Sequence, residues 1–414
     1  MNLQKSPIEI MSPAGSYESL MAAIQGGADS VYFGVGTLNM RARSSMNFSL
    51  EDLAQIAAIC REHKIRSYLT VNTVIYDEET AYLQSVVEAA RENGISAIIA
   101  SDIAVMDYAR SQGVEVHIST QCNISNFQAV KFYARYADVM VLARELSLEQ
   151  IAAITKRIEE ENITGPSGKR IEIEIFVHGA MCMAVSGKCY LSQDMFNKSA
   201  NRGACYQPCR REYRIRDYDD EVDLSIDNHF IMSPKDMKTI DFLDKIIGAG
   251  VRVLKIEGRG RAPEYVKTVT RCYREAANAI LDGTFTEDKI ALWNSRLNQV
   301  YNRGYWEGYY LGKTLPEWTN VYGSKSTRKK TFIGKITNYF GKIGIAEVTI
   351  ETGELKTGDD YVILGPTTGV IEGKIEEIRV DEKPAEKTFK GEVCSIPVKE
   401  IVRRSDKLYK ITDR

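Results

Sequence analysis

Four cysteines lie close together in the middle of the chain. They are Cys182, Cys189, Cys205 and Cys209, in the spacing C-x6-C-x15-C-x3-C. Four thiolates are the full ligand set of a structural zinc ion or of an iron–sulfur cluster. The stretch lacks the C-x2-C pairs typical of zinc ribbons, which favours the cluster, while zinc and four unligated thiols stay open as alternatives. The other four cysteines are scattered along the chain, as buried thiols usually are.

Basic residues follow the cysteines and recur near the end of the chain. Arg210 and Arg211 come directly after Cys209, and a second run holds Arg328, Lys329 and Lys330. The formal net charge is only −2, so any attraction for a nucleic acid must come from local patches. Both runs are candidate contacts for nucleic-acid phosphates, and Arg210 and Arg211 could instead stabilise an anionic four-thiolate cluster, bind an anionic substrate or be solvated surface charge.

Ionisable and amide side chains end several short apolar runs. In the segment VLKIEGRG, strand alternation places Lys255, Glu257 and Arg259 on one face. Such groups are costly among apolar neighbours unless they are paired, so they indicate either a site or a buried salt-bridge network. The other residues of this kind are Arg41, Arg43, Asn72, Gln121, Arg144 and His178. A partly cationic rim suits a small anion, and the histidine is a candidate general acid or base, or a histidine paired only with backbone.

Eight apolar runs rich in β-branched residues alternate with amphipathic helical segments. The runs cover residues 8–12, 30–34, 67–71, 97–101, 116–120, 139–144, 173–178 and 253–257. This alternation predicts an α/β fold, a (β/α)8 TIM-like barrel, with a doubly wound open sheet as the alternative. A barrel brings the carboxyl ends of its strands to one mouth, which is where the polar residues above would meet.

The domain organisation follows from where this rhythm breaks. Residues 1–312 form the predicted barrel, and the long insertion 179–232 carries the cysteines and should lie over the barrel mouth. Residues 313–330 have the composition of a linker. Residues 331–414 contain short strands separated by turns, which predicts a small C-terminal all-β barrel.

Several functional classes are disfavoured by the sequence. The chain has 414 residues and 44% hydrophobic content, but no apolar run of about 20 residues, so no membrane contact is expected. The N-terminal segment does not have the pattern of a secretory signal, so we expect a cytoplasmic protein whose cysteines stay reduced or bind metal. Ser-His-Asp order, H-E-x-x-H and the P-loop pattern are absent from the sequence.

Longer blocks of sequence resemble a known family. The segment EIEIFVHGAMCMAVSGKCYLSQ resembles the signature of the peptidase U32 family, as do SPAGSYESLMAAIQGGADSVYFG, HISTQCNISN and NRGACYQPCR. The resemblance runs from about residue 8 to residue 310, and residues 331–414 resemble the C-terminal domain of that family. The family name records an early collagenase-like protease assignment. Better understood members are hydroxylases with a 4Fe-4S cluster on four cysteines, acting on tRNA uridine, ribosomal RNA cytidine or the ubiquinone ring without oxygen.

The length and layout are most similar to the prephenate-dependent tRNA uridine hydroxylases. This resemblance implies oxygen-independent formation of 5-hydroxyuridine at the wobble position, with a 4Fe-4S cluster on the four cysteines and prephenate as hydroxyl donor. tRNA and a small anionic metabolite would be the partners, and an oligomer with itself or with a family paralogue stays open. His178, Lys255 and Glu257 are the expected catalytic residues. The expected substrate-binding residues are Arg41, Arg43, Asn72, Gln121, Arg144 and Arg259. The alternatives are a hydroxylase of 23S rRNA cytidine and a collagenase-like peptidase.

Overall fold

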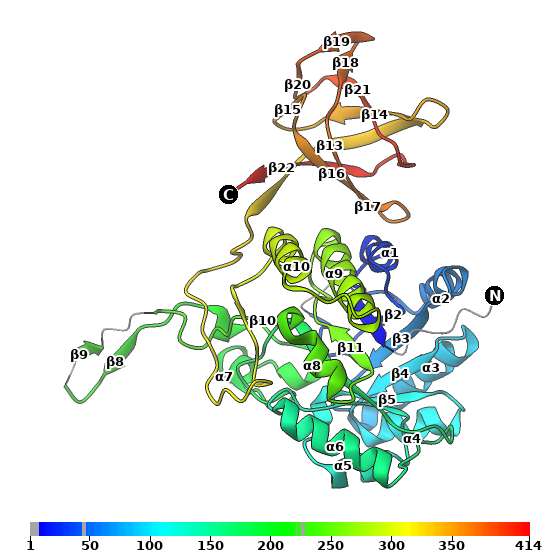
Figure 1. Ribbon diagram of the computed structural model, residues 1–414, viewed down its shortest axis with the longest axis vertical. Helices are drawn as coiled ribbons and strands as arrows, with labels where there is room; N and C mark the ends of the chain where they lie inside the picture. Colours follow the sequence, from blue (N-terminus) through cyan, green and yellow to red (C-terminus); the bar gives the residue numbers. More distant parts are fainter. Residues whose placement is uncertain (1–7, 44–46, 221, 225–227) are drawn as a thin grey trace.

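The computed structural model describes residues 8–43, 47–220, 222–224 and 228–414. Figure 1 shows an α/β domain and, above it, an all-β domain formed by the end of the chain. No helix among these residues is both long and apolar enough to cross a membrane.

Eight parallel strands form a closed barrel. They are β1 (Glu9–Pro13), β2 (Ser30–Gly34), β3 (Arg66–Val71), β4 (Ala97–Ala100), β5 (Val116–Ile118), β6 (Val139–Val141), β7 (Glu172–Ala180) and β11 (Val253–Ile256). Each strand pairs with the next in this order, and β11 pairs with both β7 and β1, which closes the ring. The structure therefore confirms the predicted TIM-like barrel, and each predicted run overlaps one strand.

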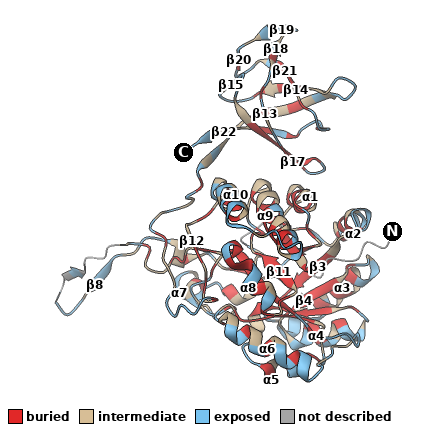
Figure 2. Ribbon diagram, in the orientation of Figure 1, coloured by how far each residue is buried: buried red, intermediate tan, exposed pale blue. Residues whose placement is uncertain are grey.

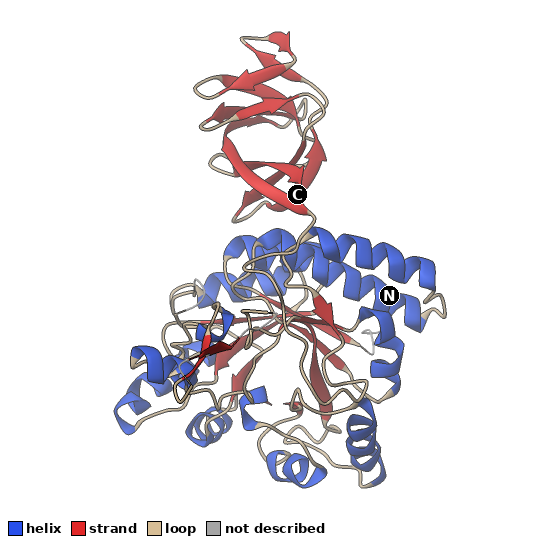
Figure 3. Cartoon of the chain, turned by 90° about the vertical axis from the view of Figure 1, so that its left-hand side faces the viewer, coloured by secondary structure: helices blue, strands red, loops and turns tan. Residues whose placement is uncertain are grey.

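Helices surround the barrel, as Figure 3 shows. They are α1 (Tyr17–Gln25), α2 (Leu53–Glu62), α3 (Thr80–Glu92), α4 (Ile103–Ser111), α5 (Phe127–Tyr133), α6 (Leu148–Glu160), α8 (Leu243–Gly248), α9 (Pro263–Leu281) and α10 (Glu287–Gln299). Several begin at a side-chain cap: Ser16, Asp102, Asn126 and Ser147 each accept a hydrogen bond from a backbone N–H in the first turn. Their apolar faces are buried against the strands (Figure 2), which makes the main core of the protein.

The cysteine segment follows β7. It contains α7 (Leu191–Phe196), two short 3-10 turns (Ala200–Arg202 and Pro208–Arg210) and the hairpin of β8 (Ile215–Asp217) and β9 (Val222–Leu224), which projects from the barrel in Figure 1. The chain returns through β10 (Asp236–Lys238), which pairs antiparallel with the end of β7 and parallel with β12 (Tyr305–Trp306). Because β10 pairs with the carboxyl end of β7, the insertion between the two strands lies at the C-terminal mouth of the barrel.

The C-terminal domain is an antiparallel β structure with its own apolar core. Its main sheet has the order β17 (Gly369–Lys374), β16 (Asp360–Gly365), β22 (Lys407–Asp413), β13 (Arg328–Phe340), β14 (Ile345–Ile350), β21 (Val393–Pro397), β18 (Ile378–Val380) and β19 (Lys383–Ala385). A second pair joins β15 (Glu354–Lys356) to β20 (Lys387–Phe389). Since β13 already begins at Arg328, the run Arg328, Lys329 and Lys330 lies on a strand and not in the linker, which corrects the expected boundary.

Specific contacts hold the two domains together. The side chain of Gln25, at the end of α1, donates to the carbonyl of Thr368 at 2.9 Å and accepts from the N–H of Val370 at 2.9 Å. Lys267 on α9 donates to the Val370 carbonyl at 2.8 Å. Val370 also belongs to the apolar core of the barrel domain. The β16–β17 hairpin is therefore packed on the outer helices of the barrel.

Candidate functional site

A cavity of about 340 Å³ opens at the carboxyl ends of the barrel strands. The cysteine segment forms one side and the strand ends form the other. The residues expected from the sequence that line it are Arg41, Asn72, Gln121, Arg144, Cys182, Cys189, Cys205, Cys209, Arg210, Lys255, Glu257 and Arg259. Most of the predicted site residues are thus brought together around one space, although they come from widely separated parts of the chain.

The four cysteines face this cavity together. Cys182 is exposed, and the other three are half-buried. Burial raises the pKa of Cys209 to about 11, and the thiols of Cys182, Cys205 and Cys189 add to that shift. Among the described residues, no three His, Cys, Asp or Glu side chains are close enough to hold a single metal ion. Four thiols around one cavity supply the number of ligands that a zinc ion or an iron–sulfur cluster needs.

Arg210 holds the cysteine segment in place. Its guanidinium donates to the carbonyl of Met181 at 2.6 Å, to the hydroxyl of Ser233 at 3.1 Å and to the carbonyl of Pro234. Burial lowers the pKa of Arg210 to about 10, with Arg303 adding to the effect. The expectation that Arg210 binds RNA is therefore corrected, because its donors are used inside the protein.

Other contacts press the segment against the barrel loops. Gly203 has φ +79°, and a Cβ built there would lie 2.5 Å from the carbonyl oxygen of Asn39. Its own carbonyl accepts a hydrogen bond from the N–H of Arg43 at 3.1 Å. Arg43 is exposed and does not line the cavity, so its expected substrate contact is not supported. Arg202 forms two hydrogen bonds with Glu79, at 2.8 and 2.9 Å.

Glu257 and Arg41 form an ion pair in the cavity wall. Nη2 of Arg41 lies 2.7 Å from Oε1 of Glu257, and the hydroxyl of Tyr32 lies 3.3 Å from Oε2. Burial alone would raise the pKa of Glu257, but Arg41, Arg144 and Arg259 outweigh it and lower the pKa to about 2. A carboxylate that stays ionised at neutral pH is a poor general acid. Glu257 therefore acts here as the anion that positions Arg41.

Lys255 is paired inside the barrel. Its ammonium lies 2.6 Å from Oε1 of Glu174 and 4.6 Å from the ring centroid of Tyr32. Glu174 is fully buried on β7, and its second oxygen has no hydrogen-bond partner among the described residues. Glu174 was not among the predicted site residues, although an acidic residue within the apolar run IEIEIF is a signal for a buried ion pair.

Three guanidinium groups in the cavity wall, those of Arg144, Arg210 and Arg259, form no ion pair with a carboxylate of the described chain. Arg259 is buried and donates to Oδ1 of Asn39 at 3.1 Å and to the hydroxyl of Thr70 at 3.0 Å; burial lowers its pKa to about 10. Arg144 stacks on Phe176 at 3.9 Å and donates to the carbonyl of Ala180, while its buried Nε lacks a partner. This surplus of positive charge suits a small anion with carboxylates.

Asn72 and Gln121 form a hydrogen-bonded group in the cavity wall. Nδ2 of Asn72 donates to the hydroxyl of Ser119 and to Oε1 of Gln121, both at 3.1 Å. Oδ1 of Asn72 accepts from the N–H of Met40 at 3.2 Å. These bonds fix the loops after β2, β3 and β5 relative to one another.

His178 lies outside the cavity. It is fully buried, its Nδ1 is 3.3 Å from the hydroxyl of Tyr273, and burial lowers its pKa to about 3. The register between β7 and β11 shifts at this point, so that Val177 is the extra residue of a β-bulge. A bulge reverses side-chain alternation, which directs His178 to the helix layer. The expected catalytic role of His178 is therefore corrected.

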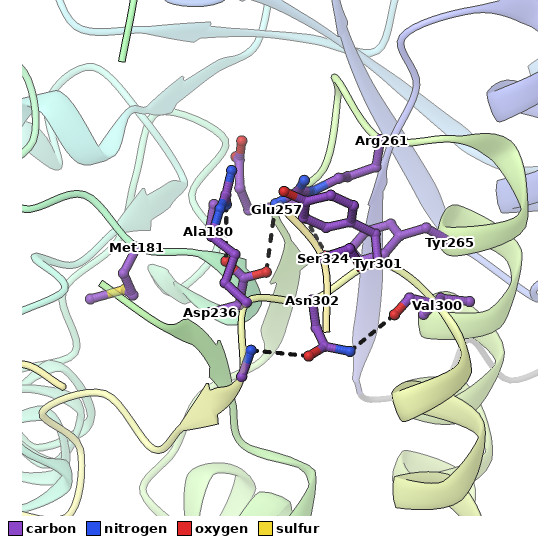
Figure 4. A network of polar contacts seen from close by, with 12 residues as sticks. Ala180, Met181, Asp236, Glu257, Arg261, Tyr265, Val300, Tyr301, Asn302 and Ser324 are labelled. Atoms are coloured by element: carbon purple, nitrogen blue, oxygen red, sulfur yellow. Dashed lines mark hydrogen bonds and ion pairs between the residues drawn. The ribbon is translucent and has the colours of Figure 1, made fainter. Parts of the chain in front are cut away.

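A second buried network, which the sequence analysis missed, adjoins the cavity (Figure 4). Asp236 on β10 is 1% exposed and lies 3.2 Å from Arg303 and 3.5 Å from Arg261. Arg261 stacks on the ring of Tyr301 at 3.8 Å. Both arginines line the cavity, so two cations share one carboxylate and add to its positive charge.

The remaining predicted RNA-binding residues differ in exposure. Arg211 is exposed and lies 5.0 Å above the ring of Phe196. Lys330 pairs with Glu264 at 2.8 Å, and Arg328 lies 4.0 Å from Asp360. Lys329 is exposed. The second basic run is therefore partly used in internal ion pairs, which weakens its expected role as an RNA contact.

Comparisons with known proteins place this site in a family. Residues 15–320 match the model of peptidase family U32. A collagenase of Porphyromonas gingivalis is 60% identical over 98% of both chains. A tRNA hydroxylation protein of Bacillus subtilis is 32% identical over 88% of this chain and 85% of its own length. A 23S rRNA 5-hydroxycytidine synthase of Escherichia coli is 35% identical over 68% of this chain and 41% of its own length. The chain belongs to peptidase family U32.

Proposed function

We propose that this protein is an RNA-modifying hydroxylase that converts the wobble uridine of tRNA to 5-hydroxyuridine without oxygen, with prephenate as hydroxyl donor. The observation that carries the proposal is that four thiols line the same cavity as Arg144 and Arg259, two cations without a carboxylate partner in the described chain. This combination suits a cluster-dependent reaction of a small dianion.

The chain's residues have distinct tasks in this proposal. Cys182, Cys189, Cys205 and Cys209 would hold the 4Fe-4S cluster, which supplies electron transfer or activation of the donor. Arg144 and Arg259 bind the carboxylates of the donor. Arg41 is a third cation, held in position by Glu257. The buried walls keep water away from these charges, which strengthens their attraction for an anion.

The names of two relatives support an RNA substrate. One is a tRNA hydroxylation protein and the other a 23S rRNA 5-hydroxycytidine synthase. The tRNA relative matches this chain over most of both lengths, whereas the rRNA enzyme is more than twice as long as the matched part. This difference favours tRNA over ribosomal RNA.

A collagenase-like peptidase is the second candidate. The relative with 60% identity carries that name, and this identity is about twice that of the tRNA relative. A peptidase needs an activated nucleophile or a metal-bound water. Among the described residues that line the cavity there is no histidine, and the hydroxyl of Ser119 is bonded to Gln121. The geometry therefore favours the hydroxylase, while the relative's name favours the peptidase.

Nucleoside mass spectrometry of tRNA and ribosomal RNA from a deletion strain separates these functions. We expect loss of 5-hydroxyuridine-derived wobble nucleosides, restored by the wild-type gene and by Cys122→Ser but not by Cys205→Ser. If the tRNA nucleosides are normal in a strain without paralogues and a hydroxycytidine is lost from ribosomal RNA, then ribosomal RNA is the substrate. Normal nucleosides in both RNAs, with gelatin cleavage by the purified protein, would establish the peptidase.

A further inference from the structure

The outer face of the cysteine segment carries exposed aromatic rings. Tyr190 is 68% exposed and Tyr206 45% exposed. The ring of Phe196 lies 5.4 Å from that of Tyr206, and Arg211 lies 5.0 Å above Phe196. Buried packing does not account for tyrosines at this exposure. We call Tyr190, Phe196, Tyr206 and Arg211 the aromatic platform.

The platform adjoins the cavity along the chain. Tyr190 follows Cys189 in the chain, and Tyr206 follows Cys205, and both cysteines line the cavity. The N–H of Tyr206 donates to the hydroxyl of Ser192 at 3.0 Å, which fixes this loop to α7. A planar group stacked on Tyr206 would therefore contact the same loop that supplies Cys205 to the cavity wall.

The charge around the platform is positive. The exposed cations of residues 188–216 are Lys188, Lys198, Arg211, Arg214 and Arg216, and the carboxylates there are Asp194 and Glu212. None of these five cations forms an ion pair with any part of the chain that the structure describes.

We propose that the aromatic platform stacks unpaired nucleotides of the RNA substrate beside the base that enters the cavity. This inference rests on the RNA substrate proposed above. Aromatic rings with flanking cations are how proteins hold single-stranded nucleic acid, because every base has a π face and every linkage a phosphate. Paired bases in an A-form helix do not offer those faces, so the platform selects a loop over a stem.

The test compares binding of a fluorescent stem-loop RNA and of a fully paired duplex by anisotropy, with cluster-loaded protein. Tyr206→Ala should weaken stem-loop binding by about 5- to 150-fold and leave duplex binding unchanged. Tyr206→Phe keeps the ring and should restore wild-type affinity. Phe132→Ala is the matched control, because Phe132 is 42% exposed with Arg135 4.6 Å from its ring but lies on α5, on the outside of the barrel.

The outcomes separate this inference from the proposed function. If the wild type binds the stem-loop and Tyr206→Ala, with unchanged melting and iron content, binds it equally well, the platform is refuted and the RNA function stands. If the wild type binds neither RNA, both are refuted. A third outcome is that the wild type binds gelatin and no RNA, and that Tyr206→Ala abolishes the gelatin binding. This result would assign the rings to peptide binding and refute the inference.

Discussion

The guanidinium of Arg41 lies 2.7 Å from the carboxylate of Glu257, and this pair joins two distant segments at the barrel mouth. Arg41 comes from the loop after β2, and Glu257 directly follows β11. The side chains are 28% and 12% exposed, so solvent screens the pair only in part. Because the pair neutralises one cation, the net positive charge of the cavity comes from Arg144, Arg210, Arg259 and the two arginines that share Asp236.

Glu257→Gln should destabilise the protein by about 2 kcal/mol, because it leaves Arg41 partly buried without its anion. Arg41→Gln should have a similar effect, and the double variant should show coupling of about 1 kcal/mol or more. Urea unfolding of the four proteins measures this. The control is Lys156→Gln, whose pair with Glu160 is exposed and should contribute less than about 1 kcal/mol. Additive losses from the two site variants would show that the pair does not couple.

His178 should make stability depend on pH. Its folded-state pKa of about 3 lies below the ordinary value of about 6.5, so below pH 6.5 the unfolded chain binds a proton that the folded chain does not. Stability from this group is complete above about pH 6.5 and falls as the pH drops towards 3, with a loss of about 2 kcal/mol at pH 5.

Urea unfolding at pH 7.5 and pH 5 tests the effect. Between these pH values, the free energy of unfolding of His178→Gln should fall by about 2 kcal/mol less than that of the wild type. The other titrating groups are the same in both proteins, so their contributions cancel in this comparison. The exposed His63 gives the control, and His63→Gln should follow the wild type. An unchanged pH dependence in His178→Gln would contradict the buried neutral histidine.

The sequence was sufficient for the barrel and for most of its mouth. Runs such as residues 97–100, with the sequence AIIA, are apolar because both faces of a barrel strand are buried, and this pattern is local. The same alternation placed Lys255, Glu257 and Arg259 on one face, and all three line the cavity. The partner of Lys255 could not be predicted in this way, because Glu174 lies on another strand and meets Lys255 only in the folded barrel.

The errors have physical causes at particular residues. His178 was misplaced because a single-residue bulge at Val177 reverses the alternation, and the local sequence does not mark it. From its place beside Arg211, Arg210 was predicted to lie at the surface. Its guanidinium instead donates to three acceptors at the two ends of the insertion. Lys330 was predicted to contact RNA, but it forms an ion pair with Glu264. This partner belongs to the barrel domain and is close to Lys330 only because the two domains pack together.

Single replacements of the clustered cysteines should remove the metal. Cys182→Ser, Cys189→Ser, Cys205→Ser and Cys209→Ser should each lose most iron and labile sulfide in anaerobically purified protein, because each takes one of four ligands. Cys122→Ser is the control, since Cys122 is half-buried near the same mouth but does not line the cavity. Stoichiometric zinc without labile sulfide in the wild type would refute the iron–sulfur assignment.

Arg259→Gln should abolish RNA modification and leave RNA affinity and iron content unchanged. The guanidinium is buried in the cavity wall, where it is placed to meet a small anion and not a phosphate backbone. Its removal should weaken prephenate binding at least about tenfold, as for the loss of a buried charged hydrogen bond. Calorimetric titration of prephenate measures this, and unchanged affinity would exclude Arg259 from the anion site. Lys329→Gln, at an exposed strand position, should leave prephenate binding intact.

Gln25 should control how firmly the C-terminal domain is attached. Gln25→Ala removes both hydrogen bonds to the β16–β17 hairpin and leaves the N–H of Val370 without its acceptor. An unmet buried donor costs about 1 to 3 kcal/mol, so the population of the undocked state should rise by about 5- to 150-fold. Under native conditions this should accelerate proteolytic cleavage in residues 313–327 by a similar factor, because the cleavage rate follows the population of the undocked state.

Gln112→Ala is the control for this prediction. It removes a side-chain acceptor of Arg91 at the end of α4, away from the interface, and should leave the cleavage rate unchanged. Equal cleavage of Gln25→Ala and wild type would mean that the remaining contacts, which include the Lys267 hydrogen bond and the apolar contacts of Val370, are enough to hold the domains together.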